Sequence, residues 1–259
     1  MGGPERPLTR IVDLSAPIVG SGPDVPVFQR TEVEYFDHAS GAAEVEEMFG
    51  VPARLLRDGE GWSREVVTLG THNSTHLDAP YHYNSHIDGE PAATIEELPL
   101  ERFFGPGVVL DFSDRADGEA IDTADVQSAL EAIPHSLQAG DIVLMRTGRD
   151  KFYGQPDYMH HGPGVTAAAT RWMYDQGVRV MGIDAWGWDR PLRMQAAEAL
   201  ERDEPGIFWE AHQVDLDYSQ IERLVNLDQL PANGFTVACF PLPIVRASAA
   251  PARVVAIFD

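Results

Sequence analysis

Eleven consecutive residues of this chain carry three histidines and one aspartate at a spacing that suits a metal ion. Neutral imidazole and carboxylate are ligands for Zn²⁺, Mn²⁺ or Fe²⁺ in proteins, and no thiolate is required. Such a density of donor groups beside small residues favours a metal site over a loop that merely faces solvent. The segment reads His72-Asn73-Ser74-Thr75-His76-Leu77-Asp78-Ala79-Pro80-Tyr81-His82.

Local geometry narrows which of these side chains can share one ion. In a strand, His72 and His76 would lie about 13 Å apart, at roughly 3.3 Å per residue, which is too far. A regular helix is disfavoured because the intervening residues, Asn73-Ser74-Thr75, favour turns. We therefore expect a tight coil that folds His72, His76 and Asp78 around one metal and leaves His82 at the rim.

His82 is the candidate for the proton transfer that bond cleavage needs. A histidine titrates near neutral pH and can pass a proton to a leaving group. We expect His82 to act beside water activated by the metal. The alternatives are that His82 is a further ligand or a histidine packed in the core.

The segment from His72 to His82 resembles the signature of the cyclase-like metal hydrolases, the family of bacterial kynurenine formamidase and isatin hydrolase. That signature is His-x-Gly-Thr-His-x-Asp-x-Pro-x-His, and Ser74 stands where the family has Gly. The Ser is small enough to preserve the turn. Further segments of the chain follow the family's order, namely Phe103–Asp111, Arg146–Gly148, Gly162–Thr166 and Val180–Asp184.

The resemblance implies an α/β fold in which a curved mixed β-sheet is flanked by helices, of the swivelling β/β/α kind. It also implies one or two divalent ions per chain, Zn²⁺ or Mn²⁺. In kynurenine formamidases, a later His and the Glu of a Glu-Asn-Leu segment hold a second ion, with the motif Asp bridging. His212 and Glu222 take those places here, and Arg223 replaces the Asn. The alternative is that Glu222 pairs with Arg223 or Arg171 at the surface.

Three tryptophans are candidates for contact with a planar substrate. Trp186 and Trp188 lie in a loop with Gly and Pro, directly after an apolar run that predicts a strand, and Trp209 follows later. Core packing is the common role of tryptophan. The loop position nevertheless favours an aromatic wall beside a small aromatic substrate.

Composition limits the classes of partner and compartment. The formal charge of −22 excludes nucleic acid and disfavours an anionic membrane surface, since both need a basic protein. The N-terminus shows no signal peptide, and the single cysteine, Cys239, allows no internal disulfide, so we expect a cytoplasmic protein. With 44% hydrophobic residues and no linker, residues 1–259 are expected to form one domain. As a separate expectation, the protein is a homo-oligomer, a dimer or tetramer.

The elements that must position these side chains are a mixture of strands and fewer helices. Capping signals predict helices that begin at Thr94, at Asp122 or Thr123, and at Thr166. A fourth helix is predicted over 193–202 from its helix formers. Apolar, β-branched runs predict strands over 10–14, 64–69, 108–112, 141–145, 178–183, 235–240 and 253–258.

Together these features predict a metal-dependent hydrolase of an amide-type C–N bond, in an aryl formamide or a cyclic amide of an aromatic compound. A serine hydrolase is unsupported because the chain has no Gly-x-Ser-x-Gly elbow. One alternative is a metal-dependent cyclase or dehydratase acting in aromatic polyketide or other secondary metabolism. Another is a non-catalytic metal-binding protein.

Overall fold

The computed structural model describes residues 9–23, 25 and 29–258, and the chain divides into two units. The larger unit comprises the described residues up to Pro17 and those from Ser74 onward. The smaller unit is Ile18–Asn73. The expected single domain over residues 1–259 stays a prediction.

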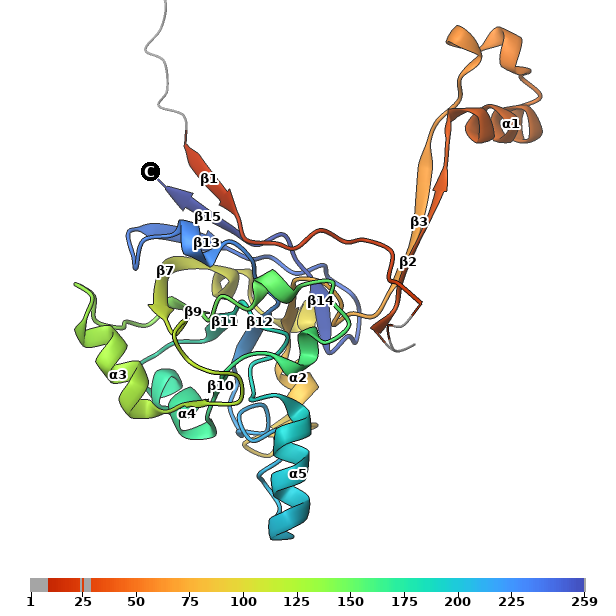
Figure 1. Cartoon of the computed structure of the whole chain (residues 1–259). Coiled ribbons are helices and arrows are strands. Elements are labelled where there is room, and N and C mark those ends of the chain that lie inside the picture. Colours follow the sequence, from red (N-terminus) through yellow and green to blue (C-terminus); the bar gives the residue numbers. More distant parts are fainter. Residues whose placement is uncertain (1–8, 24, 26–28, 259) are drawn as a thin grey trace, which may run out of the picture. The chain divides into compact units, whose positions relative to one another are not determined.

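The larger unit is built on one mixed sheet of nine strands (Figure 1). Its four central strands, β7, β9, β11 and β12, run parallel to their neighbours in that group. The outer strands pair antiparallel on both sides. The predicted α/β fold with a curled mixed sheet is confirmed. The strands, in sheet order, are β1 (Arg10–Asp13), β15 (Val255–Phe258), β13 (Phe235–Ala238), β7 (Phe104–Asp111), β9 (Ile142–Arg146), β11 (Val180–Ile183), β12 (Ser219–Glu222), β4 (His76–Asp78) and β14 (Ala249–Pro251).

Three of these strands, β7, β9 and β11, bury side chains on both faces, which explains their largely apolar sequences. Along β7, Val108 and Leu110 join one core cluster, whereas Val109 joins the other. The first cluster also takes in Val126 of α3 (Thr123–Glu131) and Met173 of α4 (Ala167–Asp175), so these two helices cover that face of the sheet (Figure 1).

Helix starts follow the capping residues predicted from the sequence. The side chain of Asp122 accepts from the Asp125 backbone at the start of α3, and Thr166 caps α4 in the same way. The predicted fourth helix is α5 (Leu192–Arg202). Thr94 opens a capping box as predicted, but the helix that follows is one 3₁₀ turn, Ile95–Glu97.

Shorter elements complete the larger unit. The helix α2 (Pro80–Tyr83) follows β4 directly, with Pro80 in its first turn, where the missing N–H costs nothing. None of the helices in the described part of the chain is both long and apolar enough to cross a bilayer.

The remaining strands are β5 (His86–Ile87), β6 (Glu90–Pro91), β8 (Ala120–Ile121) and β10 (Gly164–Val165), and the remaining 3₁₀ turns of this unit are Leu100–Phe103, Asp150–Phe152, Tyr158–His160 and Leu227–Gln229.

The smaller unit is a two-stranded antiparallel ribbon with a helix between its strands. The ribbon pairs β2 (Thr31–Phe36) with β3 (Arg64–Leu69), and the helix α1 (His38–Phe49) begins after Asp37, whose side chain caps it. Two 3₁₀ turns, Ala53–Leu55 and Arg57–Gly59, lead back to β3.

Candidate metal centre

His76 and Asp78 lie on the buried strand β4, so the prediction of a tight coil around them is wrong. The turn ends before the strand, and Ser74 within it has a left-handed backbone, φ 58°. Side chains two residues apart on a strand face the same way. The strand therefore aims both candidate ligands to one side and Leu77 into the core.

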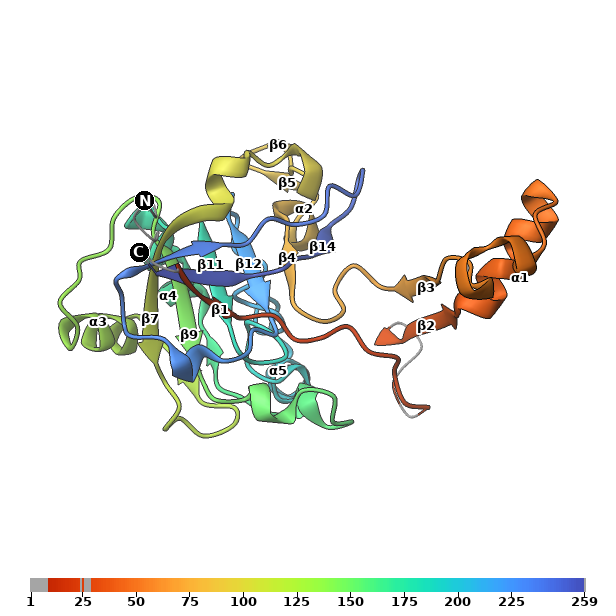
Figure 2. The ribbon, with the colours of Figure 1, turned by 90° about the horizontal axis from the view of Figure 1, so that it is seen from above.

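The register of β4 against β12 brings a third ligand to the same face. The two strands lie side by side (Figure 2). Glu222 is paired with His76, Gln220 with Asp78, and Ile221 with Leu77. Residues opposite each other on one face have Cβ atoms about 5 Å apart. Accordingly, one ligand atom from each of His76, Asp78 and Glu222 lies within 4.8 Å of the others, and all three residues are buried.

Hydrogen bonding fixes the tautomer of His76. Its Nδ1 lies 2.9 Å from the Ser74 carbonyl oxygen, which can only accept, so Nδ1 carries the proton. The other ring nitrogen, Nε2, faces the carboxylates, 3.3 Å from Asp78 Oδ1 and 3.6 Å from Glu222 Oε2. A histidine held through Nδ1–H in this way presents Nε2 to a metal.

His212 joins this cluster from a loop far along the chain. Its Nε2 lies 3.3 Å from Glu222 Oε1 and 4.0 Å from Asp78 Oδ2. The structure therefore brings together His76 and Asp78 of the motif and the two residues predicted for a second ion. The surface pairing considered for Glu222 is wrong, because Glu222 is buried and accepts from the Trp188 backbone N–H at 2.9 Å.

Asp189 orients His212 and was not predicted from the sequence. Its Oδ2 lies 2.5 Å from His212 Nδ1 and also accepts from the His212 backbone N–H. The buried Gln195 of α5 donates to Asp189 Oδ1 and accepts from the Trp209 backbone N–H. Asp189 lies in the tryptophan-rich run from Trp186 to Arg190, where an acidic residue among aromatic ones was the available signal. Gln195 lies among helix-forming residues of α5 and gives no such signal.

We expect Asp189→Asn to weaken metal binding without abolishing it. Loss of the carboxylate removes the partner that holds the His212 ring, and such partners are worth about 10- to 100-fold in metal affinity. Titration of the metal-free chain with Zn²⁺ measures the change, and Asp114→Asn, at an exposed aspartate, is the matched control. An unchanged affinity in Asp189→Asn would mean that His212 does not ligate the metal.

The electrostatics of the centre favour a bound cation. Burial opposes charge on His212, but its hydrogen bonds to Asp189 and Glu222 prevail and raise its pKa to about 10. Burial likewise opposes charge on Glu222, yet the His212 contact holds its pKa below the usual value. Buried carboxylates need a compensating positive charge. With two imidazoles among them, the donor set fits a divalent ion such as Zn²⁺ or Mn²⁺.

His82 lies beside the cluster on the short helix α2 and is half-buried. One of its ring nitrogens is within 4.8 Å of an Asp78 carboxylate oxygen. Its ring centroid is 5.8 Å from that of His212 and 5.0 Å from that of Trp209. His72 belongs to the smaller unit, so its role as a ligand stays a prediction.

The three tryptophans have different environments. Trp209 is half-buried and stacks on the His212 ring, with centroids 4.6 Å apart. Trp186 is also half-buried. Trp188 is fully buried in the core and its indole N–H donates to Thr170 Oγ1. The prediction that Trp188 lines a substrate wall is therefore wrong, because its ring is used in packing.

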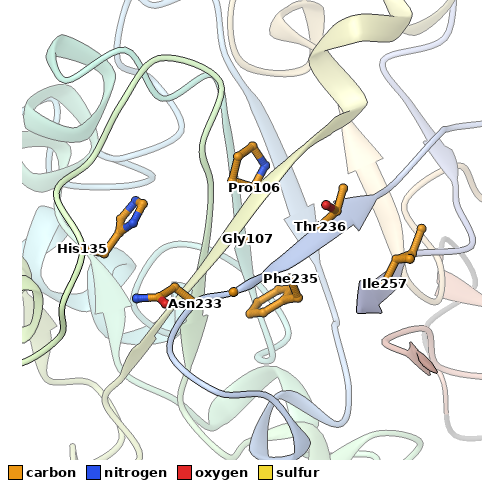
Figure 3. A pocket seen from close by; sticks show the side chains of 8 residues that line it. Pro106, Gly107, His135, Asn233, Phe235, Thr236 and Ile257 are labelled. Carbon is orange, nitrogen blue, oxygen red and sulfur yellow. The ribbon is translucent and has the colours of Figure 1, made fainter. Parts of the chain in front are cut away.

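A separate depression of about 340 Å³ lies on β7 and β13, away from these residues (Figure 3). Its polar lining includes His135, whose Nε2 is 2.7 Å from Asp141 Oδ2. None of the candidate ligands lines it. Cys239 is buried, and burial raises the pKa of its thiol, which disfavours it as a nucleophile.

Comparisons with known proteins show similarity in sequence and in fold. A family model described as "Putative cyclase" matches residues 12–190. The isatin hydrolase of Roseibium aggregatum is 29% identical over 253 residues, 91% of this chain and 88% of that protein. The kynurenine formamidase of Erythrobacter litoralis is 30% identical over 206 residues, 78% of this chain and 81% of that protein. The solved structure of isatin hydrolase A from Labrenzia aggregata, bound to benzyl benzoate, has a TM-score of 0.74 at 26% identity, covering 96% of this chain and 94% of that one.

Proposed function

Given that this chain belongs to the cyclase family, we propose that it is a metal-dependent hydrolase that opens an amide-type C–N bond in a small aromatic compound. The observation that carries the proposal is the buried cluster of His76, Asp78, Glu222 and His212. The relatives named above are hydrolases, which favours hydrolysis over a cyclase or dehydratase reaction and over a non-catalytic metal-binding role.

The proposed metal ligands are His76, Asp78, Glu222 and His212, with His72 as a further candidate from the motif. These residues would hold one or two Zn²⁺ or Mn²⁺ ions, and Asp78 is placed to serve both histidines, since its two oxygens face different rings. A divalent ion supplies activated water near neutral pH and polarises the amide carbonyl.

His82 is the proposed proton shuttle. Cleavage of a C–N bond requires that the departing nitrogen be protonated, and a histidine within reach of the reacting atoms does this well. The ring of His82 meets the Trp209 ring edge-on and lies beside His212, at the border of the cluster. This position suits a group that exchanges protons with the substrate.

Trp186 and Trp209 are the proposed contacts for the aromatic part of the substrate. We expect Trp209→Leu to raise KM for an aryl formamide by about 3- to 10-fold, since an aromatic pair is worth roughly 0.5–1.5 kcal/mol. Steady-state kinetics with parallel metal analysis measures the effect. Trp172→Leu, on α4, is the matched control, and an unchanged KM in Trp209→Leu would assign Trp209 to the support of His212 alone.

We further propose a cytoplasmic homo-oligomer, a dimer or tetramer. A chain with one cysteine suits a reducing compartment. The ribbon of the smaller unit exposes Tyr35, Val66 and Val67, and a two-stranded ribbon is marginally stable without further packing. Sedimentation equilibrium tests the assembly, and a monomer at micromolar concentration would contradict it.

The proposed function is tested by hydrolysis of N-formylaniline, N-formylanthranilate and isatin by the chain loaded with Zn²⁺ or Mn²⁺. We expect turnover of at least one of these amides by the loaded chain and none by the metal-free chain. Absence of turnover on all three amides, with metal bound, would contradict amide hydrolysis as the activity.

A further inference from the structure

The residue that follows the candidate ligand Glu222 has an unusual backbone. Arg223 has φ 59°, in the left-handed region that side chains other than Gly, Asn and Asp rarely adopt. Its position is fixed on both sides, because its N–H donates to the Ala185 carbonyl at 3.0 Å and its carbonyl accepts from Thr75 Oγ1 at 2.6 Å. Residues held in such strained conformations cluster at functional sites, which directs attention to the Arg223 side chain.

The Arg223 side chain is a buried cation. The residue is 9% exposed, its Nε donates to the Trp186 carbonyl at 3.4 Å, and its guanidinium carbon lies 5.1 Å from the centre of the Trp186 ring. Among the described residues, no carboxylate forms an ion pair with it. A buried charge without a counter-ion is costly, so the guanidinium is available to an anionic ligand.

Tyr158 adds a buried hydroxyl near the motif, because its ring meets the Tyr153 ring edge-on and the Tyr153 hydroxyl donates to Ser74 Oγ at 3.2 Å. Tyr158 is 5% exposed, and within the described part of the chain its Oη has no hydrogen-bond partner. Burial raises the pKa of Tyr158 well above its usual value, and the charges that act on the hydroxyl include those of Arg223 and Glu222. The hydroxyl therefore remains a donor. A buried donor left unpaired in the protein is suited to a ligand that accepts.

One loop connects these groups to the metal centre. The backbone N–H of Trp188 donates to Glu222 Oε1 at 2.9 Å, and two residues earlier the Trp186 carbonyl accepts from Arg223. Because this loop contacts both Glu222 and Arg223, the guanidinium and the Trp186 ring adjoin the ligand cluster. With the Tyr158 hydroxyl, they supply one positive charge, one neutral donor and one aromatic surface.

We propose that Arg223 and Tyr158 bind a carboxylate of the aromatic substrate beside the metal centre, with Trp186 against its ring. The planar guanidinium matches a carboxylate with two parallel hydrogen bonds. A chain of formal charge −22 repels anions at long range, so an anionic substrate needs a local cation of this kind. This inference rests on the proposed hydrolase function and names its substrate class: aryl amides that carry a carboxylate.

The test compares benzoate with benzamide, its neutral analogue, by titration calorimetry on the metal-loaded chain. Arg223→Asn is the variant, because Asn tolerates the left-handed backbone. We expect the preference for benzoate over benzamide to fall by about 10- to 100-fold in Arg223→Asn, and by about 3- to 10-fold in Tyr158→Phe. Arg171→Asn, an exposed arginine on α4, is the matched control. An unchanged preference in Arg223→Asn at equal metal content would overturn the proposal.

Kinetics separate this proposal from the function on which it rests. For wild type and Arg223→Asn, kcat/KM is measured on N-formylanthranilate and on N-formylaniline. We expect the ratio of the two values to fall in the variant by about 10- to 100-fold. If wild type and Arg223→Asn give the same ratio, Arg223 does not bind the substrate carboxylate, and the proposed hydrolase function still stands. Benzoate binding that depends on Arg223, without turnover of any amide, would support the subsite and contradict the hydrolase.

Discussion

Asp78→Ala is expected to abolish metal binding and hydrolysis while leaving the chain folded. Asp78 is fully buried, and its two oxygens face the two imidazoles of the centre, His76 at 3.3 Å and His212 at 4.0 Å. Elemental analysis of the purified variant measures metal content, and the rate should fall to the background of uncatalysed hydrolysis.

A matched control separates ligand loss from general damage. Asp175→Ala removes a carboxylate from the exposed end of α4 and should leave both metal content and rate unchanged. The Asp78→Ala variant should keep the far-ultraviolet circular dichroism of the wild type, since the strands pair through their backbones. A full equivalent of metal in folded Asp78→Ala would show that this centre is assigned to the wrong residues.

His82→Ala is expected to retain metal and substrate binding and to lose turnover by about 10²- to 10⁴-fold, the usual contribution of general acid–base catalysis. The side chain lies next to the cluster but on a different element, α2, so its removal leaves the register of β4 and β12 intact. Rates on N-formylaniline with saturating metal measure the loss. His86→Ala, at an exposed histidine of β5, should behave as wild type.

Two other results for His82→Ala would change its assignment. If the variant loses both its bound metal and its activity, His82 is a metal ligand. The ring nitrogen that lies within 4.8 Å of an Asp78 carboxylate oxygen agrees with that role. Turnover near the wild-type value would remove His82 from the mechanism.

Local signals account for the elements that were predicted correctly. Strands such as β3 and β9 are runs of β-branched and apolar residues, and α3 and α4 begin at the capping residues Asp122 and Thr166. These signals act within a few residues, so the sequence contains them. The strand β4 was missed because three residues are too few to show an alternating pattern, and turn-forming residues precede them.

The geometry of the centre depends on pairings between distant segments. Glu222 faces His76 because β12 pairs with β4 across more than half the chain, and no local pattern specifies that register. The run from Trp186 to Asp189 shows the same limit. Its residue types suggested a surface for substrate, but tertiary packing buries Trp188 and gives Asp189 the role of orienting His212.

The central claim is that a metal held by His76, Asp78, Glu222 and His212 drives amide hydrolysis. The most direct measurement is the rate of N-formylaniline hydrolysis as Zn²⁺ or Mn²⁺ is added to metal-free chain. We predict that the metal-free chain gives no hydrolysis, that the rate rises linearly with added metal, and that it reaches a plateau at one or two metal equivalents per chain. A rate that is already present without metal, or metal that binds to saturation without producing any rate, would contradict the claim.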